Sequence, residues 1–98
     1  MKNYEEIINS SPVVLVEFYA TWCPHCQRMM PRVADIKEKL TGKVNVFQFD
    51  IDKNTELDKE EEIETIPTFI IYKEGKEEWR YSGEMEEGIL LSTIESYL

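Results

Sequence analysis

The stretch that decides the fold is VEFYATWCPHC, residues 16–26. It joins the end of an apolar run, Val13–Tyr19, to Cys23 and Cys26. An apolar run of this length, rich in β-branched and aromatic residues, is typical of a strand buried on both faces of a sheet. One residue, Glu17, interrupts the run with a carboxylate. The sequence therefore predicts a buried strand that leads directly into the segment carrying both cysteines.

The pattern after the cysteines is helical. Between positions 23 and 40, apolar residues recur at spacings of four, three and four, which marks one apolar helix face: Met29, Val33, Ile36 and Leu40. Pro31 lies inside this expected helix, Cys23–Leu40, and should kink it. Gly42 should end it.

The remaining elements alternate between helix and strand. We expect helices over Asn3–Ser10, Asn54–Ile63 and Glu84–Leu98, and strands over Val44–Ile51, Thr68–Tyr72 and Glu77–Tyr81. Strand–helix alternation gives a parallel sheet with right-handed crossovers, and the two last strands, joined through Glu74 and Gly75, add an antiparallel hairpin. The order therefore predicts an α/β domain with a central mixed sheet.

Length and charge limit the classes of function. The chain has 98 residues, so we expect one domain over residues 1–98, and we expect it to be a monomer. Eleven Lys and Arg against twenty Asp and Glu give a formal net charge of −9, which disfavours nucleic acid and anionic membranes as partners. The apolar runs are too short to span a bilayer, and the first residues do not resemble a signal peptide. We expect a cytoplasmic protein, unless an export signal has been removed.

Cys23 and Cys26 are the only cysteines and lie three positions apart. A secreted scaffold of this size usually has more cysteines at wider spacings, so this pair is typical of a reactive site. A dithiol catalyst needs one thiolate that attacks a disulfide and a second thiol that releases the mixed disulfide. At a helix start, unpaired backbone N–H groups stabilise the first thiolate. We therefore expect Cys23 to be the nucleophile, Cys26 the resolving thiol, and the pair to form a reversible disulfide.

Other uses of a Cys-x-x-Cys motif need ligands that this chain does not offer. Structural zinc requires two more ligands, and the sequence contains no further cysteine or histidine outside the motif. A c-type haem requires His directly after Cys26, where Gln27 stands. We expect neither a metal nor a cofactor, and a metal or iron–sulfur cluster shared between two chains stays the alternative.

Several motifs together resemble the thioredoxin superfamily. Residues 16–26 are similar to its strand and active-site signature, Pro31 matches its helix-kinking proline, Ile66–Phe69 is similar to its cis-proline loop, and Gly75 and Gly83 fit its later turn glycines. The resemblance covers residues 4–98. It implies a thioredoxin fold, with a central mixed sheet of four strands, or of five, flanked by helices.

The resemblance also implies roles for residues around the cysteines. Ile66 and Pro67 would be joined by a cis peptide bond, in a loop that faces Cys23 and pairs the Ile66 backbone with an extended substrate. An ordinary trans proline that leads into a strand is the alternative. Trp22 would lie at the rim of the active site. Pro24, between the cysteines, would support the active site or contact the substrate.

Glu17 departs from the family pattern. Thioredoxins usually carry Asp at this position, a buried acid that exchanges protons with the resolving cysteine. Glu17 either does the same with a longer side chain or is a core carboxylate satisfied by backbone or water. Gln48 replaces the family's nearby lysine, which removes a charge partner and should leave Glu17 more easily protonated.

Two further departures concern the N-terminus and the residues between the cysteines. The N-terminal segment lacks the pattern of the family's first strand, so Val44–Ile51 is expected at an open sheet edge. Pro24 and His25 replace the usual Gly-Pro and are similar to the dipeptide of strongly oxidising periplasmic enzymes. His25 either stabilises the Cys23 thiolate, which would make the pair more oxidising, or is a solvent-facing helix residue.

These observations predict a thiol–disulfide oxidoreductase that reduces or exchanges protein disulfides. Its partners would be disulfide-containing client proteins and a reductase that recycles the dithiol. A glutathione-linked, glutaredoxin-like reductase is one alternative, because Cys23-Pro24-His25-Cys26 also fits a Cys-Pro-x-Cys motif. A non-catalytic module that binds client proteins, in the manner of a chaperone, is the other.

Overall fold

The apolar run Val13–Tyr19 forms an inner strand of the sheet. In the computed structural model, which describes residues 3–98, strand β1 (Val13–Tyr19) lies between β2 (Asn45–Asp50) and β3 (Thr68–Lys73), and β4 (Lys76–Ser82) completes the order β2-β1-β3-β4. β2 is parallel to β1, whereas β3 is antiparallel to β1 and β4 is antiparallel to β3. The mixed α/β sheet expected from the sequence is thus confirmed.

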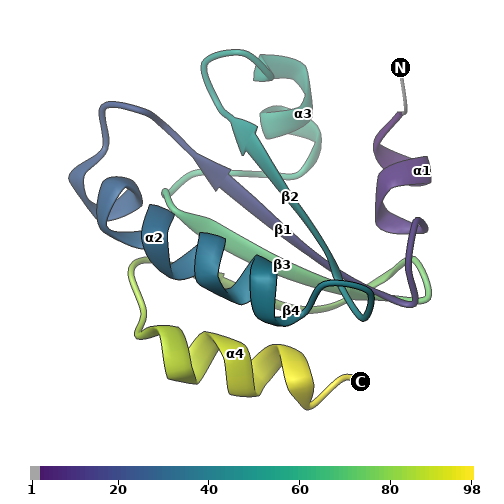
Figure 1. Ribbon diagram of the computed structural model, residues 1–98. Helices are drawn as coiled ribbons and strands as arrows, with labels where there is room; N and C mark the ends of the chain where they lie inside the picture. The colour runs from purple at the N-terminus through teal and green to yellow at the C-terminus, as the bar shows by residue number, and fades with distance from the viewer. Residues whose placement is uncertain (1–2) are drawn as a thin grey trace.

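Two helices cover each face of the sheet (Figure 1). Helices α2 (Pro24–Lys39) and α4 (Glu87–Glu95) lie on one face, and α1 (Tyr4–Ile8) and α3 (Thr55–Glu60) lie on the other. No helix within residues 3–98 is long and apolar enough to cross a membrane. Met1 and Lys2, which belong to the expected domain 1–98, lie outside the described residues.

β1 supplies both halves of the core because its side chains alternate between the two faces. Val13 and Leu15 pack under α2 and α4, whereas Val14, Val16 and Phe18 pack under α1 and α3. All five side chains are at most 1% exposed. A strand buried on both faces is therefore confirmed. By the same alternation, residue 17 points toward the face that α2 covers.

All four helices are shorter than the sequence predicted, α3 and α4 the most. The expected helix Asn54–Ile63 ends at Glu60, because Glu62 has a left-handed backbone with a φ of 56°. The Ile63 N–H donates to the Asp58 carbonyl at 2.8 Å, and the Glu62 N–H donates to the Lys59 carbonyl at 3.1 Å, the two bonds of a Schellman cap. The expected helix from Glu84 begins instead at Glu87.

The β3–β4 hairpin forms at the expected turn. Glu74 and Gly75 both have positive φ, 52° and 77°, which is typical of the two-residue type I′ turn. A Cβ atom at position 75 would also collide with the Asn9 side chain, so this turn requires glycine.

β2 lies at one edge of the four-stranded sheet, as expected, and residues 3–98 contain no fifth strand. Its side chains alternate as the sequence indicates. Val46 is buried on the α2 side, and Phe47 and Phe49 pack on the side of α1 and α3. Edge strands leave one row of backbone N–H and carbonyl groups unpaired within their sheet.

Tyr4 fastens the short helix α1 to the sheet. Its ring contacts Phe18, Phe49 and Tyr72, with ring centroids 6.4, 5.7 and 5.9 Å away. Its hydroxyl lies 2.6 Å from the Tyr72 hydroxyl, which in turn donates to Glu61 Oε1 at 3.1 Å. Tyr72 therefore accepts the hydrogen of Tyr4, and one chain of hydrogen bonds joins α1, β3 and the end of α3.

We predict that Tyr4→Phe lowers the free energy of unfolding by about 1 kcal/mol, because the ring stays packed and one partly buried hydrogen bond is lost. Urea denaturation followed by tryptophan fluorescence measures this change. Tyr81→Phe is the matched control, since Tyr81 is 42% exposed and should leave stability unchanged. Equal effects of the two substitutions would contradict the role given to the Tyr4 hydroxyl.

Candidate active site

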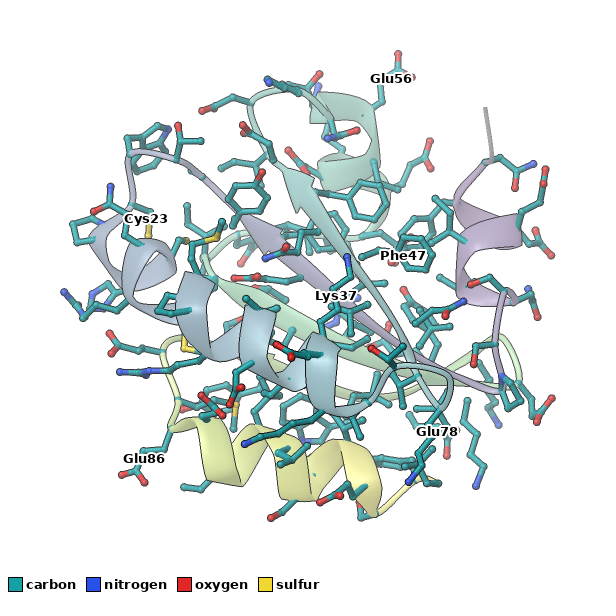
Figure 2. All side chains as sticks on the ribbon, in the orientation of Figure 1. Cys23, Lys37, Phe47, Glu56, Glu78 and Glu86 are labelled. Atoms are coloured by element: carbon teal, nitrogen blue, oxygen red, sulfur yellow. The ribbon has the colours of Figure 1, made fainter. Side chains whose placement is uncertain are left out.

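Cys23 occupies the N-cap of helix α2 (Figure 2). Its backbone is extended, with φ −89° and ψ 117°, and its Sγ accepts a hydrogen bond from the Cys26 N–H at 3.3 Å. Pro24 follows at the start of the helix, where its fixed φ suits the first turn and its missing N–H costs no hydrogen bond. The sulfur atom thus takes the place of the usual capping oxygen, at the end of the helix where the peptide dipoles favour negative charge.

Cys26 lies one turn further into α2 and is 1% exposed, against 5% for Cys23. Both are free cysteines in this structure. Burial raises the pKa of the Cys26 thiol to about 12, and its hydrogen bond with Cys23 raises the pKa as well. Cys26 is therefore protonated at neutral pH. A thiol that is buried and protonated is suited to the resolving role rather than to the first attack.

The peptide bond between Ile66 and Pro67 is cis, as the family resemblance implied. Ile66 packs against the small buried cluster that Cys23 and Cys26 form with Ala20. The Pro67 carbonyl accepts a hydrogen bond of 2.7 Å from the backbone N–H of Gly83. The fold therefore brings this loop against the cysteine pair and holds it from the other side through the segment after β4.

Glu17 is fully buried on the side of β1 that faces α2. Gln48, its neighbour on β2, donates an amide hydrogen to Glu17 Oε1 at 2.8 Å, whereas Oε2 has no hydrogen-bond partner among residues 3–98. Burial raises the pKa of Glu17 to about 7, although the bond from Gln48 opposes this shift. We expected that replacing the family's lysine with Gln48 would leave Glu17 more easily protonated, and the raised pKa agrees with this expectation.

The charge of Glu17 influences the protonation of Cys26. The negative charge of Glu17 is among the causes that raise the pKa of Cys26. A hollow of about 230 Å³ opens onto Cys26 between the end of β1 and the first turns of α2, and Met30 lines it. The Met30 sulfur also lies 3.8 Å from the Gln48 amide nitrogen that binds Glu17.

Trp22 lies at the rim of the site, as the resemblance implied. Its side chain is 62% exposed, and its indole N–H donates to Asp52 Oδ2 at 2.8 Å. Sequence reasoning did not identify Asp52, because no motif connects two residues that are 30 positions apart. The contact orients the indole beside Cys23 rather than burying it.

His25 projects from the first turn of α2 and is 61% exposed. Its Nδ1 lies 3.0 Å from Glu84 Oε1 and 2.9 Å from Arg28 Nη2. Arg28 and Arg32 also bind Glu84, and the hydrogen bonds from His25 and then Arg28 lower the pKa of Glu84 to about 2. Sequence reasoning missed Glu84 and both arginines. The one available signal was the position of Glu84 directly after the turn glycine Gly83.

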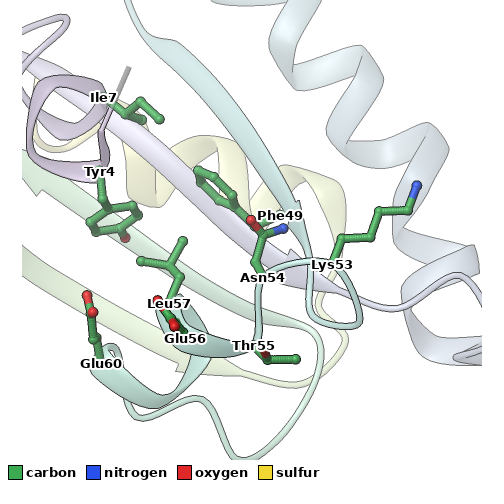
Figure 3. A pocket seen from close by; sticks show the side chains of 9 residues that line it. All are labelled: Tyr4, Ile7, Phe49, Lys53, Asn54, Thr55, Glu56, Leu57 and Glu60. Atoms are coloured by element: carbon green, nitrogen blue, oxygen red, sulfur yellow. The ribbon is translucent and has the colours of Figure 1, made fainter. Parts of the chain in front are cut away.

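A larger hollow of the described surface lies elsewhere. It measures about 630 Å³ and lies between α1 and α3, where Tyr4, Phe49 and Leu57 gather around it (Figure 3). None of the site residues expected from the sequence lines it. Within residues 3–98, no group of three or more His, Cys, Asp or Glu is placed to hold a metal ion.

Comparison with known proteins agrees with this geometry. The family model described as Thioredoxin matches residues 1–96. The chain belongs to the thioredoxin family. Among solved structures, a thioredoxin variant from Halobacterium salinarum superimposes with a TM-score of 0.87 at 30% identity, over 95% of this chain and 80% of that one. The thioredoxin fold expected from the sequence is confirmed.

Two curated thioredoxins illustrate how the family members compare in length. The chain is 41% identical to thioredoxin Y, chloroplastic, from Oryza sativa subsp. japonica, over 98% of its own length and 58% of the relative's. It is 35% identical to a thioredoxin from Synechocystis sp., over 96% of its own length and 88% of the relative's. This thioredoxin-family chain thus spans little more than half of the rice protein and most of the cyanobacterial one.

The raised pKa of Glu17 predicts a pH-dependent stability. Between its ordinary value of 4.5 and about 7, the folded state binds a proton that the unfolded state releases. Stability should therefore fall as pH rises through this range, by on the order of 3 kcal/mol, and level off above it. Glu17→Gln should remove this loss, so that the variant is more stable than the wild type at pH 8 and similar at pH 4.5.

Urea denaturation of the reduced proteins at several pH values tests this prediction. Glu56→Gln is the matched control, because Glu56 is an exposed glutamate on α3. A constant difference in stability between Glu17→Gln and the wild type across the pH range would show that Glu17 does not titrate near 7.

Proposed function

We propose that the chain is a thiol–disulfide oxidoreductase that reduces or exchanges protein disulfides through Cys23 and Cys26. One observation carries the proposal. The Cys23 sulfur caps helix α2 and accepts the Cys26 N–H, while the Cys26 thiol is buried behind it. This arrangement stabilises one thiolate and keeps a second thiol in reserve, which is what two-step disulfide exchange requires.

The first step uses the Cys23 thiolate. Its sulfur attacks one sulfur of the client disulfide, so that a bond forms between Cys23 and the client and the client's own S–S bond breaks. The second client sulfur leaves with the electron pair and takes a proton from solvent. Cys26 does not compete in this step, because its raised pKa keeps it protonated.

The second step needs a proton to leave Cys26. We assign the acceptor role to the carboxylate of Glu17, whose raised pKa of about 7 makes it a base at neutral pH. The Cys26 thiolate then attacks Cys23 Sγ, the mixed disulfide breaks, and the client leaves with both of its sulfurs reduced. Cys23 and Cys26 are oxidised to a disulfide, and the two electrons that they lose reduce the client disulfide to two thiols.

Residues around the pair would hold the client. The loop with the cis Ile66–Pro67 bond packs against the cysteine cluster, where the backbone of Ile66 can pair with an extended client segment. Trp22 offers an exposed aromatic surface that Asp52 orients. No contact in the described residues favours the glutathione-linked or the non-catalytic alternative over protein-disulfide exchange.

The proposed cycle requires two kinds of partner. Clients would be proteins with accessible disulfides, and a separate reductase would return the Cys23–Cys26 disulfide to the dithiol. A monomeric state and a cytoplasmic location also stay predictions, and the rice relative is a chloroplastic protein.

The assignment of the two thiols predicts opposite behaviour of two variants. Cys26→Ser should accumulate a stable mixed disulfide with a client, because the first attack proceeds and the second thiol is missing. Cys23→Ser should form none, because Cys26 is buried and protonated. Non-reducing electrophoresis and mass spectrometry measure the adducts, and iodoacetamide should label Cys23 first in the wild type. Adducts on Cys26 would reverse the roles.

The role of Glu17 predicts a selective effect on the second step. A disulfide that joins two different peptides releases one peptide when Cys23 attacks and the other when Cys26 resolves the intermediate. Glu17→Gln should slow the second release about tenfold or more and leave the first largely unchanged, since general-base catalysis contributes at least this much. Rapid-quench kinetics separate the two rates, with Glu56→Gln as control. Unchanged rates of both releases would make Glu17 a core residue only.

A further inference from the structure

The carboxylate of Glu84 joins three side chains of the helix that carries the cysteines. Its Oε1 accepts hydrogen bonds from Arg28 Nε at 2.8 Å and lies 3.0 Å from His25 Nδ1, and its Oε2 lies 3.2 Å from Arg32 Nη2. The three partners occupy positions 25, 28 and 32 of α2, which face the same side of a helix. One partly exposed carboxylate thus binds His25, Arg28 and Arg32, the basic side chains in the first turns of this helix face.

Glu84 belongs to the segment between β4 and α4, not to α2. The preceding residue, Gly83, donates its backbone N–H to the Pro67 carbonyl, and the following residue, Met85, accepts from Arg32 Nη1 at 2.8 Å. The position of the carboxylate is therefore set by the same segment that holds the cis-proline loop. This segment explains why α4 begins late, because residues 83–86 extend along the start of α2 instead of continuing the helix.

The His25 ring has one hydrogen or one lone pair at Nδ1, so its two neighbours there correspond to two states. With a hydrogen on Nδ1, the ring donates to Glu84, and without it the ring accepts from Arg28 Nη2. In the first state the carboxylate compensates any positive charge on the ring. In both states Glu84 keeps the ring and the guanidinium together on this face of α2.

The charge of this cluster bears on the reactive sulfur. Positive charge at the first turns of α2 adds to the peptide dipoles that stabilise a Cys23 thiolate, and a stabilised thiolate makes a cysteine pair more oxidising. A carboxylate at the same place subtracts from that effect. We propose that Glu84 is a positioning residue that keeps the Cys23–Cys26 couple reducing, by binding His25 and Arg28 and placing a negative charge among the cationic groups near the thiolate. This inference rests on the proposed function.

The redox equilibrium with glutathione measures the effect directly. Reduced protein and glutathione disulfide exchange two electrons and two protons, giving the Cys23–Cys26 disulfide and two molecules of glutathione. Glu84→Gln should shift this equilibrium toward the reduced protein about three- to tenfold, which corresponds to roughly 15 to 30 mV in potential. The shift should shrink in 1 M salt, where charges are screened within ~3 Å.

Two further variants make the test specific. Glu86→Gln removes the same charge two positions away, from an exposed side chain that makes no capping hydrogen bond, and should leave the equilibrium near that of the wild type. Arg28→Gln removes a positive charge from the cluster and should shift the equilibrium the opposite way, toward the oxidised protein. Circular dichroism and urea denaturation establish that each variant is folded before its equilibrium is measured.

The outcomes separate this inference from the function beneath it. Opposite shifts for Glu84→Gln and Arg28→Gln, with Glu86→Gln unchanged, support it. An equilibrium of Glu84→Gln equal to the wild type's, or moved toward the oxidised protein, overturns it while leaving the oxidoreductase intact. A wild-type protein that forms no reversible Cys23–Cys26 disulfide with glutathione would instead contradict the proposed function itself.

Discussion

The hydrogen bond from the Cys26 N–H to the Cys23 sulfur is the contact on which the rest of the site depends. It exists only if the chain leaves β1 at Tyr19, turns over the next four residues and begins a helix at Pro24. The buried strand fixes where that turn occurs, since its side chains fill both halves of the core and allow no sliding. A sulfur atom held in this way meets backbone donors without needing a charged neighbour.

The same strand carries Glu17, the acid that we assign to the second step. Glu17 replaces an apolar residue in the middle of β1, and a buried carboxylate with one unpartnered oxygen is costly when charged. The fold tolerates it because the proton stays on until about pH 7. The burial that raises the pKa of Glu17 therefore weakens the core in alkaline solution and also makes Glu17 a proton acceptor near neutral pH. A stronger partner than Gln48 would stabilise the charged form and lower this basicity.

The sequence was sufficient for the sheet and the cysteine-bearing helix, because these follow from local patterns of apolar residues, and its resemblance to the thioredoxin superfamily implied the cis-proline loop. It was less successful at helix ends. The backbone at Glu62 is left-handed although the residue is not glycine, so no sequence signal marks the end of α3. The late start of α4 depends on contacts with α2. It could not identify Glu84, whose bonds to His25 and Arg28 join residues 59 and 56 positions apart. Such long-range pairs form only in the assembled fold, and no periodic pattern in the sequence indicates them.

Two glutamates near the cysteines show how the environment gives the same type of side chain two different roles. Glu17 has no cation beside it and is shut away from water, so its pKa rises and it can exchange a proton. Glu84 is partly exposed among His25 and two arginines, so its pKa falls and it stays negatively charged near neutral pH. In the proposed cycle, the first acid acts on the resolving thiol by moving a proton. The second can act on the attacking thiol only through its field, which makes the potential of the couple, rather than the rate of proton transfer, the property in which its effect should be visible.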